Sequence, residues 1–281
     1  MTATGVKHDT RPRAGTLRRV GSELVALLAL PARAPRRVAR APMLPAARAV
    51  LALLAAAALV AFAMFTLDGW ALAQQKRVPI LVIDFFNQIT DYGRSGWFLW
   101  PSGILIIALA LLAATTQRLA RLTIISLIVR LEFIFVAIAL PGLVVTIVKR
   151  LIGRVRPSAA GPFAYVPFSW RPDYASMPSG HATTAFAVAI TLGALWPRAR
   201  PVLWLYALLI AASRVIIAAH YPSDVIAGAC VGGFGALLIR NHFAARHLGF
   251  VAVHDGTARA LPGPSLRRLK SIFARLFATA S

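Results

Sequence analysis

His181 is one of two histidines that lie among residues suited to handling an oxyanion. It follows Pro178, Ser179 and Gly180 directly before an apolar run. Ser179 is placed to cap a helix there, and Gly180 lets the backbone approach a ligand closely. The free N–H groups at a helix start bind phosphate readily. An imidazole beside that phosphate can give or take a proton, so His181 is a candidate acid or base, unless it is only part of a structural turn.

A second cluster contains His220 and Asp224, which are four residues apart, and the preceding Arg214. Four residues make one helical turn, although Pro222 is equally compatible with a non-helical turn. In either case the carboxylate can hold one imidazole nitrogen and make the other more nucleophilic. Arg214 lies in an apolar stretch, and a charge inside a membrane is a functional candidate by default. The alternative is an interfacial arginine that pairs with Asp224.

A third cluster holds Lys149 and Arg156, seven residues apart, followed by Pro157. Seven residues are about two helical turns, so both cations would project from one face if the helix continues that far. Pro157 would end that helix soon afterwards. Two cations on one face suit a group with two negative charges, the lysine as a point charge and the arginine as a fork.

The elements that carry these clusters must be membrane helices. The 281 residues are 58% hydrophobic and only 14% charged, whereas soluble domains have about 25% charged residues. We therefore expect an all-α, polytopic membrane helix bundle with about six transmembrane helices. The stretch 68–94 mixes apolar and acidic residues and favours an interfacial helix. The expected spans are 49–67, 95–116, 131–148, 181–196, 201–219 and 224–239. Arg130 and Glu132 at the start of the third span should snorkel, face protein or form a local ion pair.

We divide the chain into a basic cytoplasmic tail (1–48), a membrane domain (49–240) and a second basic cytoplasmic tail (241–281). Leu24 to Leu30 is too short to cross a membrane and at most lies on its surface. The short connections at 117–121 and 198–200 are also basic, so the positive-inside rule places them and both termini in the cytoplasm. The excess of 31 Lys and Arg over 9 Asp and Glu suits an anionic membrane surface, and no nucleic-acid recognition module is visible.

This topology returns all three clusters to one membrane surface. Spans four and five carry the chain across and back, so His181 and His220 reach the same face, which Lys149 also reaches. Cys230 has no second cysteine to pair with and no metal-ligand spacing around it.

The clusters together resemble one known family. The run KxxxxxxRP at Lys149 to Pro157, PSGH at Pro178 to His181 and SRxxxxxHxxxD at Ser213 to Asp224 look like the type 2 phosphatidic acid phosphatase superfamily, in its integral membrane lipid phosphatase branch. All three motifs match in order within residues 130 to 240. The tails and the first two spans lie outside the resemblance.

The resemblance implies a phosphohistidine mechanism without a metal or other cofactor. His220 would attack phosphorus, Asp224 would orient and charge it, and His181 would protonate the leaving oxygen and later activate water. The residues that would hold the phosphoryl oxygens are Lys149, Arg156, Ser179, Gly180 and Arg214. The family also includes soluble vanadate-dependent haloperoxidases. The expected membrane spans argue against assigning this chain to that group.

The expected partner is a lipid phosphate in the bilayer, with the site facing the periplasm of a bacterial inner membrane. Extra cations at Arg150, Arg154 and Arg171 favour more than one phosphate, as in a prenyl diphosphate or a lipid A-type glycolipid, while glycerolipid phosphates stay open. Aromatic residues of the 158–177 loop could touch acyl or prenyl chains, or merely anchor the loop at the interface. Two alternatives are a lipid phosphotransferase that uses the same site and a non-catalytic lipid-binding membrane protein.

Overall fold

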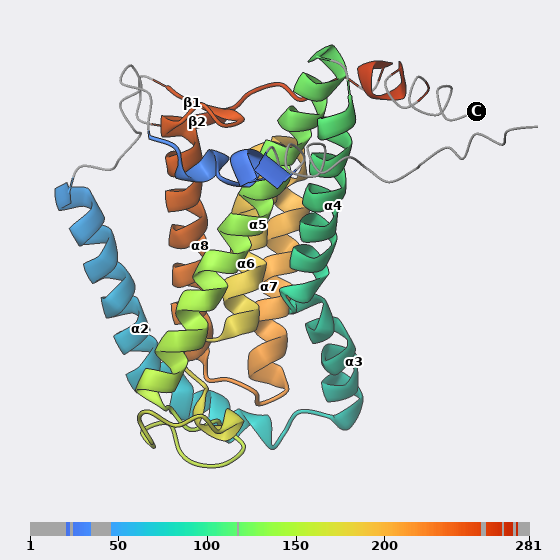
Figure 1. Ribbon diagram of the computed structural model, residues 1–281. Coiled ribbons are helices and arrows are strands. Elements are labelled where there is room, and N and C mark those ends of the chain that lie inside the picture. The colour runs from blue at the N-terminus through green and yellow to red at the C-terminus, as the bar shows by residue number, and fades with distance from the viewer. Residues whose placement is uncertain are drawn as a thin grey trace, which may run out of the picture.

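The computed structural model describes residues 21–22, 25–34, 46–116, 118–253, 257–265, 267–271 and 274. Within them the fold is a helix bundle with one small hairpin (Figure 1). The helices are α2 (Ala46–Gln75), α3 (Ile80–Thr90), α4 (Gly96–Thr115), α5 (Arg118–Ile152), α6 (Gly180–Leu195), α7 (Arg200–Ile216) and α8 (Pro222–Ala245). Four short 3-10 turns cover Leu30–Ala32, Asp91–Gly93, Pro172–Tyr174 and Pro197–Ala199. Strands β1 (Phe250–Ala252) and β2 (Ala258–Ala260) pair antiparallel, with Phe250 opposite Ala260.

The bundle has the helices that a polytopic membrane protein needs. Among the described residues, five helical segments are long and apolar enough to cross a membrane, and α6 is a shorter apolar helix. This agrees with the expected fold of about six membrane helices. The stretch expected to form one interfacial helix is divided, because residues 68–75 continue α2 and α3 forms a separate helix. Helix α5 begins at Arg118, well before the expected start at residue 131.

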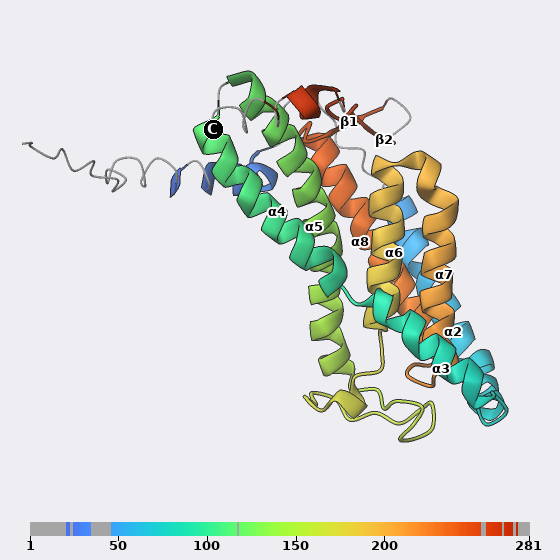
Figure 2. The same ribbon diagram turned by 90° about the vertical axis from the view of Figure 1, so that its right-hand side faces the viewer.

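Helix α6 lies inside the bundle and packs against α5, α7 and α8 (Figure 2). Glycines of α8 permit the closest approach: a Cβ at Gly228 would lie 2.4 Å from the Ser179 carbonyl oxygen, and one at Gly232 would lie 2.2 Å from that of Thr183. The backbone N–H of Ser179 donates to the Asp224 carbonyl oxygen at 2.9 Å. The N-terminal ends of α6 and α8 are therefore fixed side by side.

The opposite end of the bundle carries the hairpin and the short segment that contains Leu27 and Leu30 (Figure 1). Both leucines are buried in the hydrophobic core, so this segment packs against the bundle rather than only lying on a surface. Arg130 donates to the carbonyl oxygens of Leu261 and Pro262 at 2.9 Å each. Among the three outcomes expected for Glu132, the structure shows that it faces protein, since its side chain is buried. Its carboxylate has no hydrogen-bond partner among the described residues, so the expected local ion pair with Arg130 is wrong.

Candidate active site

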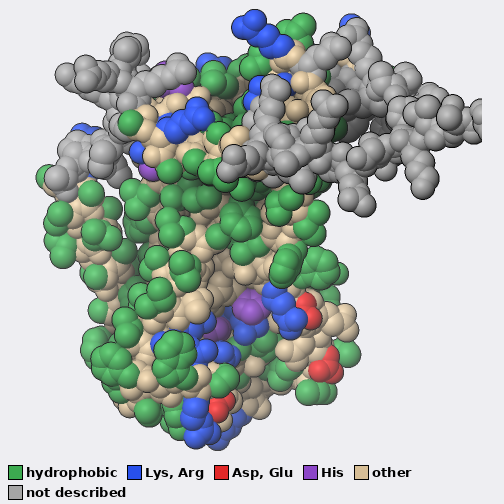
Figure 3. Space-filling view, in the orientation of Figure 1, with side chains coloured by type: hydrophobic (Ala, Val, Ile, Leu, Met, Phe, Trp, Pro, Cys, Tyr) green, Lys and Arg blue, Asp and Glu red, His purple; other side chains and the backbone are tan. Residues whose placement is uncertain are grey.

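Residues from all three sequence clusters meet at the end of the bundle away from the hairpin. Figure 3 shows basic and histidine side chains grouped below a wide hydrophobic belt. A Cβ at Gly180 would lie 3.5 Å from Lys149 Nζ, which places the end of α5 beside the start of α6. The His220 N–H donates to the Arg214 carbonyl oxygen at 3.1 Å, and Arg156 Nη1 reaches that of Ala219 at 3.5 Å. The topology inferred from the sequence thus brings the clusters together.

His220 lies just before α8 and faces the carboxylate of Asp224. Its Nδ1 is 3.8 Å from Asp224 Oδ2, which is too long for a hydrogen bond. Ser176 Oγ donates to the same Oδ2 at 2.5 Å and lies 3.5 Å from His220 Nδ1, and the Tyr221 N–H donates to Oδ2 at 3.0 Å. With Nδ1 turned toward a carboxylate, the favoured tautomer keeps the proton there and leaves a lone pair on Nε2.

Burial controls the charge of His220. The ring is only 3% exposed, and burial lowers its pKa to about 4 against the opposing effect of Asp224. The positive charges of Arg214 and Arg156 lower this pKa further. His220 is consequently neutral near pH 7, which is the state that a nucleophilic imidazole requires.

Two further buried charged side chains, Arg154 and Asp68, lie behind Asp224. Arg154 Nη1 donates to Asp224 Oδ1 at 2.6 Å, while its Nη2 donates to Asp68 Oδ2 on α2 at 2.7 Å. These three side chains are completely buried. Burial would lower the pKa of Arg154, but Asp224 and Asp68 outweigh it and raise the pKa above the usual arginine value. The suggestion that Arg154 is a cation for substrate is therefore wrong, because the guanidinium is enclosed and already paired.

In the part of the chain that the structure describes, two buried polar atoms at the site lack a hydrogen-bond partner: Ser179 Oγ and Arg214 Nε. Ser179 occupies the N-cap position of α6, yet its hydroxyl makes no capping bond. Arg214 donates through Nη1 to Thr90 Oγ1 at 2.6 Å, and the alternative in which it pairs with Asp224 is wrong because Arg154 takes that place. Buried donors seldom stay unpaired, so both atoms are candidate donors to a bound oxyanion.

The end of α5 differs from expectation. The helix stops at Ile152 because Gly153 adopts a φ of +65°, and a Cβ there would lie 1.9 Å from the Val166 carbonyl oxygen. Arg156 therefore lies on the following loop and does not share a helix face with Lys149. It still contributes to the same electrostatic environment as Lys149, and its Nε donates to the Pro172 carbonyl oxygen at 3.0 Å. Burial lowers the pKa of Arg156, which nevertheless remains a cation at neutral pH.

The loop between α5 and α6 carries exposed aromatic side chains beside the site. Trp170 is 81% exposed, and its backbone and ring hold Arg150 through a 2.6 Å hydrogen bond and a cation–π contact. Phe163 instead packs on Phe65 of α2, with ring centroids 5.8 Å apart. The exposed Arg171 pairs with Asp173 at 3.8 Å. Arg150 and Arg171 thus lie at the rim, outside the buried centre.

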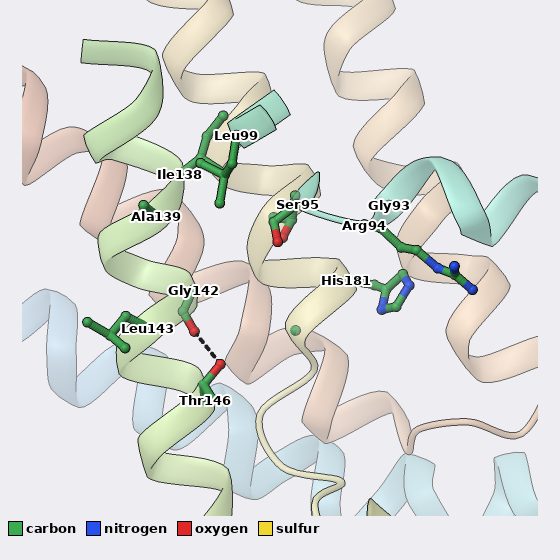
Figure 4. Close-up of a pocket in the computed structure, with 12 residues that line it drawn as sticks. Gly93, Arg94, Ser95, Leu99, Ile138, Ala139, Gly142, Leu143, Thr146 and His181 are labelled. Atoms are coloured by element: carbon green, nitrogen blue, oxygen red, sulfur yellow. Dashed lines mark hydrogen bonds between the residues drawn. The ribbon is translucent and has the colours of Figure 1, made fainter. Parts of the chain in front are cut away.

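A cavity of about 380 Å³ extends from His181 between α4, α5 and α6. Figure 4 shows His181 and Arg94 on one side of this groove and Leu99, Ile138 and Leu143 on the other. Gly93 is required where the loop passes the histidine, because a Cβ there would lie 2.7 Å from Ile210 and 3.0 Å from the His181 ring. A titratable ring therefore stands at the polar end of an otherwise largely apolar groove.

Sequence reasoning did not place several residues in the site. Asp68 and Ser176 are fully buried around Asp224. Thr90 is the last residue of α3, and Arg94 lies in the connection between α3 and α4. The one sequence signal for Asp68 was its position, as an acidic residue directly after the apolar run of the first span. The other three had none, because they are brought in by tertiary packing.

Comparison with known proteins gives a consistent result. The family description "PAP2 superfamily" matches residues 130–247. A lipid A 1-phosphatase of Rhizobium etli is 34% identical over 184 residues, which cover 63% of this chain and 78% of that protein. A lipid A 1-phosphatase of Rhizobium johnstonii is 34% identical over 186 residues, 64% of this chain and 75% of that protein. A crystal structure of a PAP2-type phosphatidylglycerolphosphate phosphatase from Bacillus subtilis aligns over 79% of this chain and 94% of its own, with 21% identity and a TM-score of 0.39.

Proposed function

Since this chain belongs to the PAP2 superfamily and is a membrane lipid phosphatase, we propose that it hydrolyses the phosphate of a lipid A-type glycolipid at the site around His181 and His220. The observation that carries this proposal is the apolar groove that ends at His181. A soluble phosphate ester needs no such groove, whereas an amphiphile needs a path for its hydrocarbon beside the polar chemistry.

In the first half of the reaction, Nε2 of His220 attacks phosphorus and forms a P–N bond as the P–O bond to the lipid breaks. His181 gives a proton to the leaving oxygen, so the lipid departs as an alcohol. Asp224 stabilises the positive charge that the His220 ring acquires. In the second half, His181 takes a proton from water, and that oxygen attacks phosphorus and breaks the P–N bond. Inorganic phosphate leaves and both rings return to their starting states.

The phosphoryl oxygens would be held by Lys149, Arg156, Arg214, the Ser179 hydroxyl and the backbone at Gly180. The unpartnered atoms Ser179 Oγ and Arg214 Nε support this assignment, since a bound phosphate would supply what they lack. Helix α6 also begins there, so its N–H groups and dipole favour a bound anion. Fixed cations and N–H groups of this kind stabilise the charge that develops during phosphoryl transfer.

For the substrate we favour the 1-phosphate of lipid A, by similarity to the two rhizobial relatives. The rim cations Arg150 and Arg171 support a headgroup with additional negative charge, although Arg154 no longer contributes to that argument. The exposed Trp170 and Phe168, 81% and 75% accessible, suit contact with interfacial lipid.

We further propose that the site faces the periplasm of a bacterial inner membrane and that both termini lie in the cytoplasm. The turns between α4 and α5 and between α6 and α7 lie at the hairpin end of the bundle (Figure 2). The basic residues there are Arg118 and Arg121 at the start of α5, Arg198 in the second turn and Arg200 at the start of α7. Short basic connections of this kind stay on the cytoplasmic side. The catalytic end is then outside.

The test is phosphate release by purified protein in detergent with EDTA present. The panel comprises lipid A, a prenyl diphosphate, phosphatidic acid and phosphatidylglycerol phosphate. We expect lipid A to be the best substrate for wild type and release to vanish in His220→Ala, with an acid-labile, alkali-stable phosphoenzyme trapped in wild type. The matched control is His247→Asn, at an exposed position with a φ of 54° that asparagine tolerates.

Each other outcome has a defined meaning. Full activity in His220→Ala would refute the assignment of the nucleophile. Lipid binding without release from any substrate would favour the phosphotransferase or the non-catalytic binder. A preference for a glycerolipid or prenyl substrate would refute the choice of lipid A alone.

A further inference from the structure

Three fully buried charges form a chain behind the proposed nucleophile. Asp68 lies on α2, Arg154 lies on the loop after α5, and Asp224 lies on α8, so three distant segments meet through their charged groups. Removing such charges from water costs several kcal/mol each unless they are paired and hydrogen bonded. Helix α2 lies outside the three motifs, and a membrane helix does not need a buried aspartate in order to span.

We propose that Arg154, anchored by Asp68, is a positioning residue that orients the Asp224 carboxylate and preserves its negative charge for His220. This inference rests on the proposed function, in which His220 is the nucleophile. Neither Arg154 nor Asp68 touches the reacting phosphate in this scheme. Both act through Asp224.

The orientation follows from the way the guanidinium is enclosed. Arg154 donates to Oδ1 of Asp224. The other oxygen, Oδ2, accepts from Ser176 and from the Tyr221 N–H, and it is the oxygen that faces the His220 ring. The guanidinium itself cannot turn, because it donates to Asp68 and to the Pro162 carbonyl oxygen and lies 4.4 Å from the centre of the Tyr221 ring. A lysine could not reproduce this planar set of contacts.

Ser223 fixes the position of Asp68, which of the three charged groups is the farthest from His220. Its backbone N–H donates to Asp68 Oδ1 at 3.0 Å, and its hydroxyl donates to Asp68 Oδ2 at 2.6 Å. Ser223 Oγ also lies 2.7 Å from Arg154 Nη1. Since Ser223 precedes Asp224, Asp68 ties α2 directly to the first turn of α8, where the carboxylate is carried.

The charge argument explains why a second aspartate is present. Arg154 alone would neutralise Asp224 and leave little negative charge for the imidazole. With Asp68 the three groups carry a net charge of −1, which can stabilise the cationic ring formed when His220 bonds phosphorus. Other ionisable groups that act on His220 are Arg214 on α7, Arg156 on the loop and His181 on α6, and none of these three supplies negative charge.

The test uses variants that change this net charge in opposite directions. Asp68→Asn makes the cluster neutral and Arg154→Gln makes it −2, while the double variant restores −1 without the ionic anchor. Full-length protein in detergent would be examined for the pKa of His220 by NMR of ¹⁵N-histidine-labelled protein, for kcat and KM on the best wild-type lipid phosphate, and for thermal stability. Asp84→Asn, an exposed carboxylate on α3, is the matched control for loss of one aspartate.

We expect Asp68→Asn to lower the pKa of His220 by about half a unit or more, and to lower kcat by about 10- to 100-fold with KM nearly unchanged. Arg154→Gln should raise that pKa if the protein folds. The double variant, which avoids two unpaired buried carboxylates, should return the pKa close to wild type while kcat stays low. Arg154→Lys should not rescue kcat.

A folded Asp68→Asn protein with the wild-type His220 pKa and kcat would overturn the proposal and leave the ion-pair chain a structural tie. Wild-type kcat in the double variant would equally refute the positioning role. The pKa readout does not need turnover. A wild-type protein that hydrolyses no lipid phosphate would therefore refute the proposed function, whereas an unshifted His220 pKa would refute this inference.

Discussion

Replacing Ser179 with alanine should lower activity without lowering stability. The Ser179 hydroxyl is completely buried and makes no hydrogen bond in this structure, although it occupies the N-cap of α6. An unsatisfied buried polar group costs about 1–3 kcal/mol, so its removal should leave the melting temperature unchanged or raise it. An ordinary serine cap would show the opposite, because its loss costs about 0.5–2 kcal/mol.

The expected loss of activity follows from the bond that this hydroxyl would make with phosphate. A hydrogen bond to a charged group contributes about 1.5–3 kcal/mol. If it is fully formed in the transition state, its loss lowers kcat/KM by about 10- to 150-fold. The measurement is kcat/KM on the best lipid phosphate and the melting temperature, both from one preparation in detergent.

Ser102→Ala is the matched control for this prediction. Ser102 is also buried, but its hydroxyl donates to the Phe98 carbonyl oxygen at 2.5 Å on α4, outside the cluster around the histidines. This variant should keep wild-type kcat/KM. If Ser179→Ala were less stable than wild type and retained kcat/KM within about twofold, the hydroxyl would be a structural cap and the reasoning would fail.

Three further predictions concern the surroundings of the site. Gly153→Ala should destabilise the protein by about 1 kcal/mol or more and disrupt the loop that carries Arg154, because the new Cβ would meet the Val166 carbonyl oxygen at 1.9 Å; equal melting temperatures of variant and wild type would contradict this. Thr90→Val removes the acceptor of Arg214 Nη1 and should lower kcat/KM by about 10-fold, whereas unchanged kinetics would show that Thr90 does not orient the arginine. The folded pKa of His220, about 4, lies below the ordinary value of 6.5, so folding favours the neutral ring. That stabilisation is complete above pH 6.5 and is lost as the pH falls toward 4. Wild type should therefore lose thermal stability more steeply than His220→Asn over this interval. Parallel plots of melting temperature against pH for the two proteins would refute this prediction.

Apolar runs predicted the helices that are apolar along most of their length. The expected span 181–196 corresponds to α6 (Gly180–Leu195), and 201–219 corresponds to α7 (Arg200–Ile216). The same reasoning failed for the start of α5, where Arg118 and Arg121 interrupt the hydropathy but do not interrupt the backbone hydrogen bonds. Hydropathy detects the part of a helix that can lie in lipid, and a helix can continue beyond it.

The convergence of Lys149, His181 and His220 could be inferred because spans alternate in direction, so the ends of successive helices fall on alternate surfaces. The conformation of the chain between Lys149 and Arg156 could not be inferred from the sequence. A φ of +65° at Gly153 depends on the approach of the Val166 carbonyl, a contact that no local pattern encodes. Arg156 nevertheless stays close enough to Lys149 to act on it electrostatically, although the two residues do not share a helix face.

The misassignment of Arg154 shows how one residue type acquires different roles within a few positions. Arg150 lies in the last turn of α5 and contacts the exposed Trp170, whereas Arg154 lies on the loop just after α5 and is buried between two aspartates. What separates them is the presence of Asp68, which is 86 residues away in sequence from Arg154. Because that aspartate accepts one side of the guanidinium, the cation can enter the interior without cancelling the charge of Asp224. In the proposed mechanism, His220 therefore acts between cations that bind the phosphate and a buried group of net negative charge that stabilises its ring. This division of charge requires Asp68 on the first membrane helix as much as it requires the motif residues.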